Sequence, residues 1–412
     1  MPHPGTLVQS AEQPAAFNAR ITLWLCTAAA LVEGFDTQSM GVVAPRVIAE
    51  FGLSPARAGV IFSAATFGLF LGAAVGGRLA DHFGRKRALV GSLLLFGTFS
   101  LLTAMAGGAQ LLFAARLLTG LGLGGAMPNF ISLASESAHS ERRLSVVTLV
   151  MAGMPLGGTL AGIMSLGGEF GWSWRSIFIA GGTTPMILAV VMMYWLPEQP
   201  HFRRDAQAHG SPRVEPVRRV LFGSGRAATT GMLWIAFFFT QLVLLLMLNW
   251  LPSLVIGLGF SRAQASWASV CFSLSGGIGA IFLGRLHAGD SRRLWVAGTY
   301  AGMAAALAAV ASAGTVFPMI ALACGFAGVF IIGAQLILFA LAPLYYHSAI
   351  RGTGVGAAVS IGRLGSVVGP LFAGALLAGG GGSGAVLIAI VPFVLVGGSA
   401  AFALTWRKQC AE

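Results

Sequence analysis

Two carboxylic acids lie inside the first strongly apolar stretch of the chain. Residues 21–44 are almost wholly hydrophobic, yet they include Glu33 and Asp36. The two acids are three residues apart and therefore share one face of a helix. An ionised carboxylate at the centre of a bilayer costs about 2.5–3.5 kcal/mol on insertion scales, so such groups persist where they face protein or water. Neighbouring acids in that position can hold and release protons. We predict proton handling by both; the alternative for Asp36 is a hydrogen bond between helices.

An arginine lies in a second apolar stretch. Arg116 falls within residues 111–135, one turn before a small-residue face formed by Gly120 and Gly124. A guanidinium inside a membrane needs a carboxylate partner, and either acid of the first stretch is a candidate. The resulting pair is either a static link between two helices or a mobile element that responds to protonation. Both interpretations remain open, and Arg116 is also a candidate for substrate binding.

A second intramembrane arginine has different surroundings. Arg363 lies about ten residues into the apolar stretch 353–377, and Gly362 and Gly365 beside it leave room for a ligand. The second half of the chain offers no acid within a span, so we expect this charge to lack a protein partner. Because the guanidinium fork binds a carboxylate through two hydrogen bonds, we predict that Arg363 binds an anionic substrate.

Several amides and one aromatic side chain form a weaker group of candidates. Polar amides in apolar helices can line a cavity or hold helices together, and phenylalanines usually pack. A phenolic hydroxyl on a substrate would need a hydrogen-bonding partner of this kind. The candidates for substrate contact are Phe35, Asn129, Gln241, Asn249 and Gln335.

Composition decides the class of protein that positions these residues. The 412 residues are 56% hydrophobic and 9% charged, with a mean hydropathy of +0.82. Because soluble domains contain about 25% charged residues, the chain is predicted to cross the membrane many times. The polar residues 1–20 contain no apolar core of a signal peptide. The four cysteines have no ligand-like spacing, and we predict no metal, cofactor, nucleotide site or catalytic constellation.

Apolar runs between turn and charge signals predict about twelve membrane spans, each of the length that a bilayer requires. A polar segment, 197–226, divides them into six and six. We therefore expect a tail at 1–20, helical halves at 21–196 and 227–406 with a linker between them, and a tail at 407–412. The expected spans are 21–44, 57–79, 88–106, 111–135, 144–167, 174–196, 228–250, 264–286, 294–312, 316–341, 353–377 and 384–406.

The basic residues alternate between loops on the two sides. Of 25 Lys and Arg residues, 19 fall in segments on the side of the N-terminus and 4 on the other side. This bias is the positive-inside signal, and it places both termini in the cytoplasm of a multi-pass protein. The net charge of +12 is thereby explained by topology and lipid contact, so no nucleic-acid partner is predicted.

One loop motif resembles a known family. The run from Gly77 to Arg87, GRLADHFGRKR, is similar to the signature between helices 2 and 3 of the major facilitator superfamily, and a degraded copy follows residue 283. The resemblance implies an all-α membrane fold of twelve transmembrane helices in two six-helix halves. We expect Gly77 and Gly84 to permit a tight turn and close helix approach, and Asp81 to pair with Arg85 at an inner gate. The alternative is that the basic run only sets topology.

A finer resemblance covers the whole chain. The run EGFD at 33–36 is similar to the helix 1 signature of the aromatic acid:proton symporter family, and the segments 128–136 and 342–370 are similar to its helix 4 end and its helix 10–11 junction. Glu33 departs from the usual Asp. With Gln335, it resembles the branch that transports 3-(3-hydroxyphenyl)propionate. The resemblances together imply these gating residues: Gly77, Asp81, Gly84, Arg85, Arg87, Glu136 and Arg351.

The resemblance implies a monomeric, proton-coupled importer of a small aromatic carboxylate in a bacterial inner membrane, with Arg351 and Arg363 important for uptake. The main alternative to an importer is a drug:proton antiporter, because residues 153–158 partly resemble the glycine-proline motif of antiporters. Export of cations would leave Arg363 unexplained. A sensor is disfavoured because the short loops leave no output domain, and an enzyme is disfavoured because no catalytic constellation is present.

Overall fold

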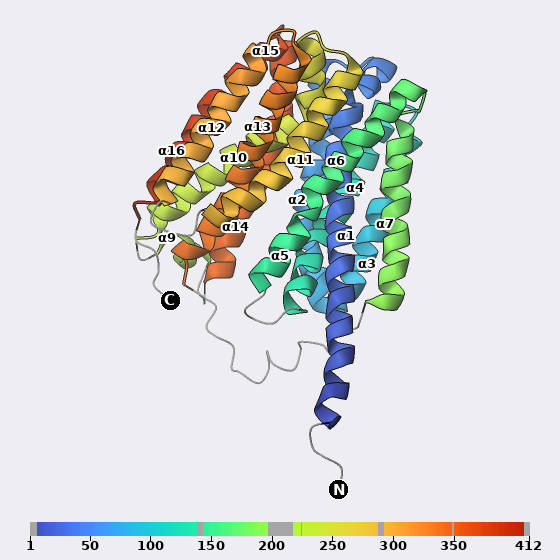
Figure 1. The fold of residues 1–412 in the computed structure, drawn as a ribbon, viewed down its shortest axis with the longest axis vertical. Helices are drawn as coiled ribbons and strands as arrows, with labels where there is room; N and C mark the ends of the chain where they lie inside the picture. The colour runs from blue at the N-terminus through green and yellow to red at the C-terminus, as the bar shows by residue number, and fades with distance from the viewer. Residues whose placement is uncertain are drawn as a thin grey trace.

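The computed structural model describes residues 6–137, 143–196, 217–223, 225–286, 292–347 and 350–407, and every regular element in these ranges is helical. Figure 1 shows the helices arranged side by side, with both termini near one end. The elements are α1 (Thr6–Phe51), α2 (Pro55–Phe83), α3 (Arg85–Ala104), α4 (Ala109–Glu136), α5 (Arg143–Met151), α6 (Gly153–Ser165), η2 (Leu166–Phe170), α7 (Arg175–Trp195), α9 (Val217–Phe222), α10 (Ala227–Gly257), α11 (Arg262–Leu286), α12 (Arg292–Ser312), α13 (Phe317–Leu341), η3 (Ala342–Tyr345), α14 (Arg351–Ala378), α15 (Ser383–Ala389) and α16 (Val391–Leu404).

The helices have the length and the hydropathy of membrane spans. Within the described residues, ten helical segments are long and apolar enough to cross a bilayer. Beside them, α1 with 46 residues and α11 with 25 residues exceed the roughly 20 residues that a span requires. Together these helices account for the twelve spans expected from the sequence, in an all-α membrane protein. The ends of α1 and α10 extend well beyond the expected bounds.

Two of the expected spans are interrupted helices. The span expected at 144–167 consists of α5 and α6, separated at Ala152. Pro155 lacks the N–H that would bond to the carbonyl of Met151, the last residue of α5, and this favours the break. The last span is similarly divided at Ile390 into α15 and α16, with Pro392 in the first turn of α16.

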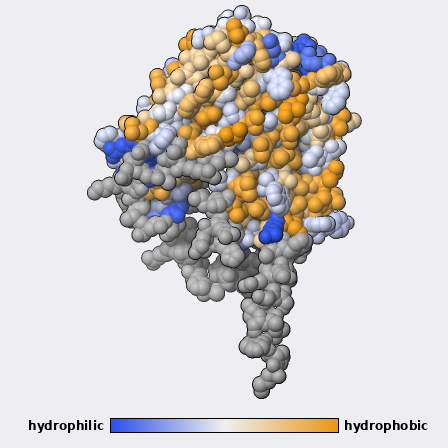
Figure 2. All heavy atoms as spheres, viewed as in Figure 1, coloured by the Kyte–Doolittle hydropathy of each residue, from blue (hydrophilic) through white to orange (hydrophobic). Residues whose placement is uncertain are grey.

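The outer surface is that of a protein surrounded by lipid. In Figure 2 hydrophobic residues cover the middle of the visible face, and hydrophilic residues gather toward its two ends. The exposed side chains of α2 recur at helical spacing and include Phe67, Leu71, Val75 and Leu79. Large apolar side chains at that spacing form a continuous stripe on one helix face, which suits contact with acyl chains.

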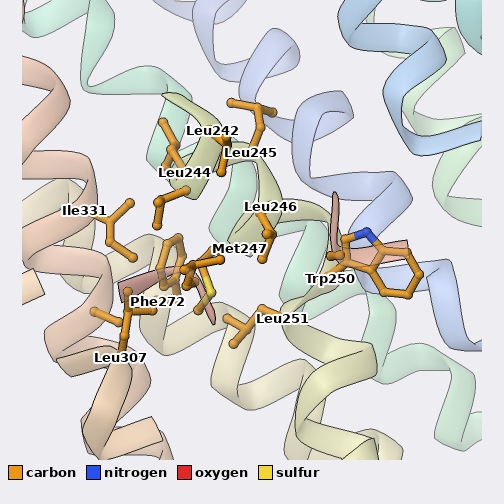
Figure 3. Close-up of a cluster of buried hydrophobic side chains, with 14 of the residues drawn as sticks. Leu242, Leu244, Leu245, Leu246, Met247, Trp250, Leu251, Phe272, Leu307 and Ile331 are labelled. Atoms are coloured by element: carbon orange, nitrogen blue, oxygen red, sulfur yellow. The ribbon is translucent and has the colours of Figure 1, made fainter. Parts of the chain in front are cut away.

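The helices form two packed groups that meet along three seams. The first group contains α1 to α7 and the second contains α10 to α16, and the seams join α2 to α14, α6 to α11 and α1 to α10. The core of the second group is built on α10, where every residue from Leu242 to Leu251 except Leu248 is buried. Figure 3 shows these side chains beside Phe272 of α11, Leu307 of α12 and Ile331 of α13.

Glycine permits the closest helix contacts. A Cβ atom added at Gly120 of α4 would collide with the backbone oxygen of Ala65 on α2, and one added at Gly76 of α2 would collide with Gly125 of α4. Small residues let two backbones approach closely, which is how membrane helices associate without a hydrophobic driving force. The seam between α2 and α4 is therefore closed to larger residues.

We expect Gly120→Ala to lower the thermal stability of the protein in detergent, because α4 must move away from α2. Gly91→Ala in α3 is the matched control, since nothing lies within 4 Å of the Cβ that it adds. Replacing glycine by alanine within a helix removes a cost of about 0.5–1 kcal/mol, so Gly91→Ala should leave stability unchanged or raised. Equal melting temperatures for the two variants would contradict the close contact.

The two groups are joined at one end of the molecule. Far from the termini, the Ser63 hydroxyl of α2 donates to the carbonyl of Val367 on α14 at 2.8 Å, and the rings of Phe62 and Trp250 meet edge to face at 5.0 Å. At the end that carries the termini, the described parts of α5 and α9 make their main contacts within their own groups. The structure is thus closed at the far end and separated near the termini.

Candidate functional site

Asp36 and Arg116 form a buried ion pair between α1 and α4. Both guanidinium nitrogens donate to the carboxylate, Nη1 to Oδ1 at 2.9 Å and Nη2 to Oδ2 at 2.8 Å. The two side chains are 1% and 2% exposed, and the guanidinium lies 5.4 Å from the ring centre of Phe178. Of the two acids predicted as partners for Arg116, the structure selects Asp36. Its two-point geometry satisfies both carboxylate oxygens.

Glu33 lies one turn earlier on α1 without a hydrogen-bonding partner. The residue is 2% exposed, and neither carboxylate oxygen accepts a hydrogen bond. Thr37 donates only to the backbone carbonyl of Glu33. A buried carboxylate without donors is costly to keep charged.

Arg363 of α14 is the cation that acts on Glu33. Each of the two groups lies in the electrostatic field of the other across the two helix groups, yet no ion pair within 4 Å joins them in the described structure. The Arg363 guanidinium instead donates through Nη2 to the thioether sulfur of Met127 on α4 at 2.9 Å, and sulfur is a weak acceptor. Within the described residues Arg363 has no ion-pair partner, and the acid whose charge acts on it, Glu33, belongs to the other half.

Two glycines turn Arg363 toward the first helix group. Gly365 packs against the backbone of Phe238, and a Cβ at Gly362 would lie 3.1 Å from Cγ of Gln241. These contacts hold one face of α14 against α10, and the arginine beside them faces away from that seam. The amide oxygen of Gln241 is buried and has no hydrogen-bonding partner, and the Gln241 side chain borders Gly362 on the α10 side of α14.

Two of the predicted amides are occupied within their own helices. Asn129 donates to the carbonyl of Gly125 at 2.7 Å, and Asn249 donates to the carbonyl of Leu245 at 2.8 Å. Both residues are buried. Asn249 also lies at the crossing of α1 and α10, where a Cβ at Gly41 would be 3.1 Å from its Cα atom.

The remaining two candidates differ in their surroundings. The ring of Phe35 lies against Gly181 of α7, where an added Cβ would be 3.2 Å from it. It therefore packs within the first helix group rather than beside Arg363. Gln335 of α13 is partly buried. Of the weaker candidates, the structure packs Gln241 against Gly362 of α14 and leaves Phe35 in a packing position.

The predicted turn after α2 is present, and one of its glycines behaves differently from expectation. Gly84 has a φ of 89° and ends α2 while α3 begins at the next residue, a conformation that favours glycine. Nothing lies within 4 Å of a Cβ added at Gly77, whereas its neighbour Gly76 makes the close contact with α4. The expected close approach at Gly77 is therefore wrong by one residue.

Two of the predicted gate residues form an ion pair with each other. Arg85 at the start of α3 pairs with Glu136 at the end of α4. The Asp81 side chain lies outside the described residues, so the expected Asp81–Arg85 pair is not part of the description. Arg351 donates through Nε to the carbonyl of Tyr346 at 3.4 Å, at the start of α14. Arg87 interacts with neighbouring groups.

Sequence reasoning missed two buried polar residues where α1, α6 and α11 meet. Gln38 of α1 and Ser273 of α11 are 1% and 2% exposed, and their side-chain polar atoms have no hydrogen-bonding partners. Gln38 is a polar amide in an apolar helix, the same signal that identified Gln241. Ser273 gives no signal in the sequence, because serines in membrane helices commonly bond to their own backbone.

Long apolar helices in two groups, with opposite charges buried between them, define a polytopic membrane carrier. The chain belongs to the major facilitator superfamily: the sequence model of that family matches residues 26–358. The 3-(3-hydroxy-phenyl)propionate transporter of Escherichia coli (strain K12) is 41% identical over 98% of this chain and 100% of its own length. The 4-hydroxybenzoate transporter PcaK of Pseudomonas putida is 32% identical over 89% of this chain and 88% of its own length.

Solved structures show the same fold at low sequence identity. A bacterial homologue of the human lysosomal transporter Spinster, in an inward-facing and occupied conformation, matches with a TM-score of 0.76 and 16% identity over 94% of this chain and 96% of that one. A D-xylose–proton symporter matches with a TM-score of 0.74 and 17% identity over 93% of this chain and 96% of that one. These likenesses support the major facilitator architecture.

Proposed function

We propose that the protein imports a small aromatic carboxylate together with protons, by alternating access across a bacterial inner membrane. The observation that supports this most strongly is a pair of incompletely satisfied opposite charges on helices of different halves, the buried Glu33 and the half-buried Arg363. A carboxylate placed against Arg363 would satisfy the guanidinium, and a proton on Glu33 would remove its charge. The named aromatic acid transporters among the relatives support the substrate class.

Binding and protonation have the same electrostatic consequence. With an empty site, the Glu33 charge is attracted to Arg363 across the interface of the halves. When Arg363 binds an anionic substrate, that attraction is offset, and the Glu33 carboxylate gains from taking up a proton. Co-import of a proton with the anion also avoids moving net negative charge against an inside-negative potential, which costs about 2.3 kcal/mol per charge at 100 mV.

We further propose that both termini and the linker 197–226 are cytoplasmic, since the basic residues gather on that side. The tails would be 1–20 and 407–412, and the halves 21–196 and 227–406. With this orientation, the separated end faces the cytoplasm and the structure is inward-facing. Arg85 and Glu136 would then lie at the inner gate, where their pair holds α3 against α4.

The test is uptake of radiolabelled 3-(3-hydroxyphenyl)propionate by proteoliposomes under an inward proton gradient. We expect accumulation above the external concentration for the wild-type protein, and loss of accumulation when the gradient is collapsed. Glu33→Gln should keep exchange of internal for external substrate while losing gradient-driven accumulation, because an amide keeps the shape but takes up no proton. Benzoate, 4-hydroxybenzoate and gallate as competitors would rank the substrates.

The antiporter alternative predicts transport of a different substrate in the opposite direction. A folded wild-type protein that accumulates no aromatic acid, and instead moves a cationic dye outward against a proton gradient, would overturn the importer. Accumulation by Glu33→Gln equal to that of the wild type would leave the importer in place and remove Glu33 as the coupling group.

A further inference from the structure

A groove in the surface of the second helix group separates α11 from α12. The two helices pack mainly on α13 rather than on each other. A Cβ atom added at Gly333 of α13 would meet Leu283 of α11, and one added at Gly302 of α12 would meet Phe330 of α13, so α13 forms the floor between them. This α11–α12 groove has a volume of about 360 Å³ and is lined by Leu283, Leu294, Trp295, Gly298, Thr299 and Phe330.

The groove opens on a face of the protein that acyl chains cover. In Figure 1, α12 lies at one edge of the bundle, where it packs on α13 and α16. Leu294 at the mouth of the groove is 76% exposed. On α13 the exposed side chains of Met319, Leu322 and Phe326 recur at helical spacing and lead to Phe330. Because a contiguous apolar surface of this kind marks contact with a membrane or a ligand, an acyl chain is the natural material to fill the groove.

Two arginines lie at one end of the groove. Arg292 and Arg293 begin α12, directly before the lining residues Leu294 and Trp295. Arg292 precedes Trp295 by three residues and therefore lies on the same helix face, and side chains tilt toward the N-terminus of their helix. The Arg293 guanidinium lies 4.2 Å from the ring centre of Trp406, beyond the end of α16. The arginines are therefore at the end of the molecule that carries the termini.

The charge at that end is positive. Residues 285–293 include three arginines and one aspartate, a net charge of +2 with histidine neutral. Within the ranges that the structure describes, the second helix group contains no Asp or Glu. Basic pockets between transmembrane helices on the cytoplasmic side bind anionic lipid head groups, and tryptophans such as Trp295 and Trp406 are enriched at the membrane interface. The groove thus combines an apolar floor with a basic, tryptophan-flanked end.

We propose that the α11–α12 groove binds one anionic phospholipid, with an acyl chain against Leu283 and Phe330 and the phosphate at Arg292 and Arg293. A guanidinium fork binds phosphate oxygens through two hydrogen bonds. The bound lipid fills the space between α11 and α12 and stabilises the folded protein through its binding free energy. The inference is independent of the proposed import of aromatic acids, because the groove shares no residue with the Glu33–Arg363 centre.

The test is native mass spectrometry of the delipidated protein in detergent. Phosphatidylglycerol and phosphatidylethanolamine with identical acyl chains are titrated separately. We expect one phosphatidylglycerol to bind at least about fivefold more tightly than phosphatidylethanolamine and to raise the melting temperature. Glycerol 3-phosphate, which carries the phosphate and lacks the acyl chains, should neither bind nor stabilise.

Charge variants test the head-group end. Arg292→Gln combined with Arg293→Gln should remove the preference for phosphatidylglycerol, because the amides carry no charge. Arg218→Gln combined with Arg219→Gln is the matched control, since it removes two charges from the exposed residues of α9, outside the groove. This control should keep the preference of the wild type.

A glycine variant tests the apolar part. Gly298 lines the groove, and nothing lies within 4 Å of a Cβ added there. Gly298→Leu should therefore fold normally, fill the groove and weaken binding of phosphatidylglycerol at least about fivefold, because each methylene that leaves the apolar surface loses about 0.8 kcal/mol. Gly91→Leu in α3 is the control, since its added Cβ also meets nothing within 4 Å, and it should bind phosphatidylglycerol as the wild type does.

Each other outcome overturns the proposal. Equal affinity of the wild type for the two phospholipids removes the head-group site, and equal losses in the two arginine pairs show a general attraction to the basic end. Wild-type binding by Gly298→Leu places the lipid elsewhere. Binding of glycerol 3-phosphate as tight as that of the lipid assigns the site to a free phosphate. The proposed import of aromatic acids stands or falls separately, on the uptake measurements.

Discussion

Arg363→Ala is expected to abolish concentrative uptake, with initial rates of aromatic acid uptake at least about thirtyfold below wild type. The Arg363 guanidinium donates to the thioether of Met127 in the other half and lies in the electrostatic field of Glu33. Removing one member of a buried, hydrogen-bonded charge pair in a complex costs about 2–5 kcal/mol, which corresponds to the expected loss. Arg363→Lys should give an intermediate rate, because it keeps the charge and loses the fork.

Two processes are measured for each variant: exchange of internal for external substrate, and accumulation of substrate driven by the proton gradient. If Arg363 binds the carboxylate, both processes fail in Arg363→Ala, whereas a coupling residue would lose accumulation alone. Met127→Leu is the matched control, since it removes the sulfur that Arg363 contacts and keeps a side chain of similar size; its rate should stay within about twofold of wild type. Wild-type exchange by a correctly folded Arg363→Ala protein would contradict the binding role.

Asp36→Asn is expected to destabilise the folded protein by about 3–5 kcal/mol, because it leaves the Arg116 charge buried without its carboxylate. The pair is 1–2% exposed and makes two charge-assisted hydrogen bonds. The same loss should follow Arg116→Ala. Thermal unfolding in detergent, followed by the fraction of monodisperse protein after heating, measures both variants against the wild type.

A double variant separates a static pair from a mobile one. Asp36→Asn combined with Arg116→Met removes both charges, and replacing a buried pair by uncharged groups is often neutral in stability. We expect the double variant to be more stable than either single variant. Proton-driven accumulation by this double variant would show that the pair is structural, and its absence with intact exchange would assign the pair to coupling.

The exposed pair between Glu50 and Arg175 provides the control for these measurements. Its hydrogen bonds of 2.7 and 3.1 Å resemble those of the buried pair, but the side chains are 39% and 32% exposed. Water competes for exposed charges, so such pairs contribute about 0–1 kcal/mol. Glu50→Gln should therefore change the melting temperature slightly. An effect as large as that of Asp36→Asn would show that burial is not the reason for the difference.

Composition, the spacing of basic residues and two motifs were sufficient to predict an all-helical membrane protein of about twelve spans. These properties are local: hydropathy follows from side chains that any lipid-facing helix must present, and the Gly84 turn follows from a backbone conformation that favours glycine. The breaks at Ala152 and Ile390 were not predicted, although Pro155 and Pro392 lie beside them, because proline is tolerated in many membrane helices.

Tertiary packing decided which charges meet. Glu33 and Asp36 are indistinguishable by spacing, and only the contact of α1 with α4 pairs Asp36 with Arg116. The acid that acts on Arg363 comes from the other half, 330 residues earlier in the chain, so no count of acids within the second half could identify it. The same holds for Gln38 and Ser273, because hydrogen-bond satisfaction depends on which helices cross, and a sequence specifies each helix more directly than it specifies their crossings.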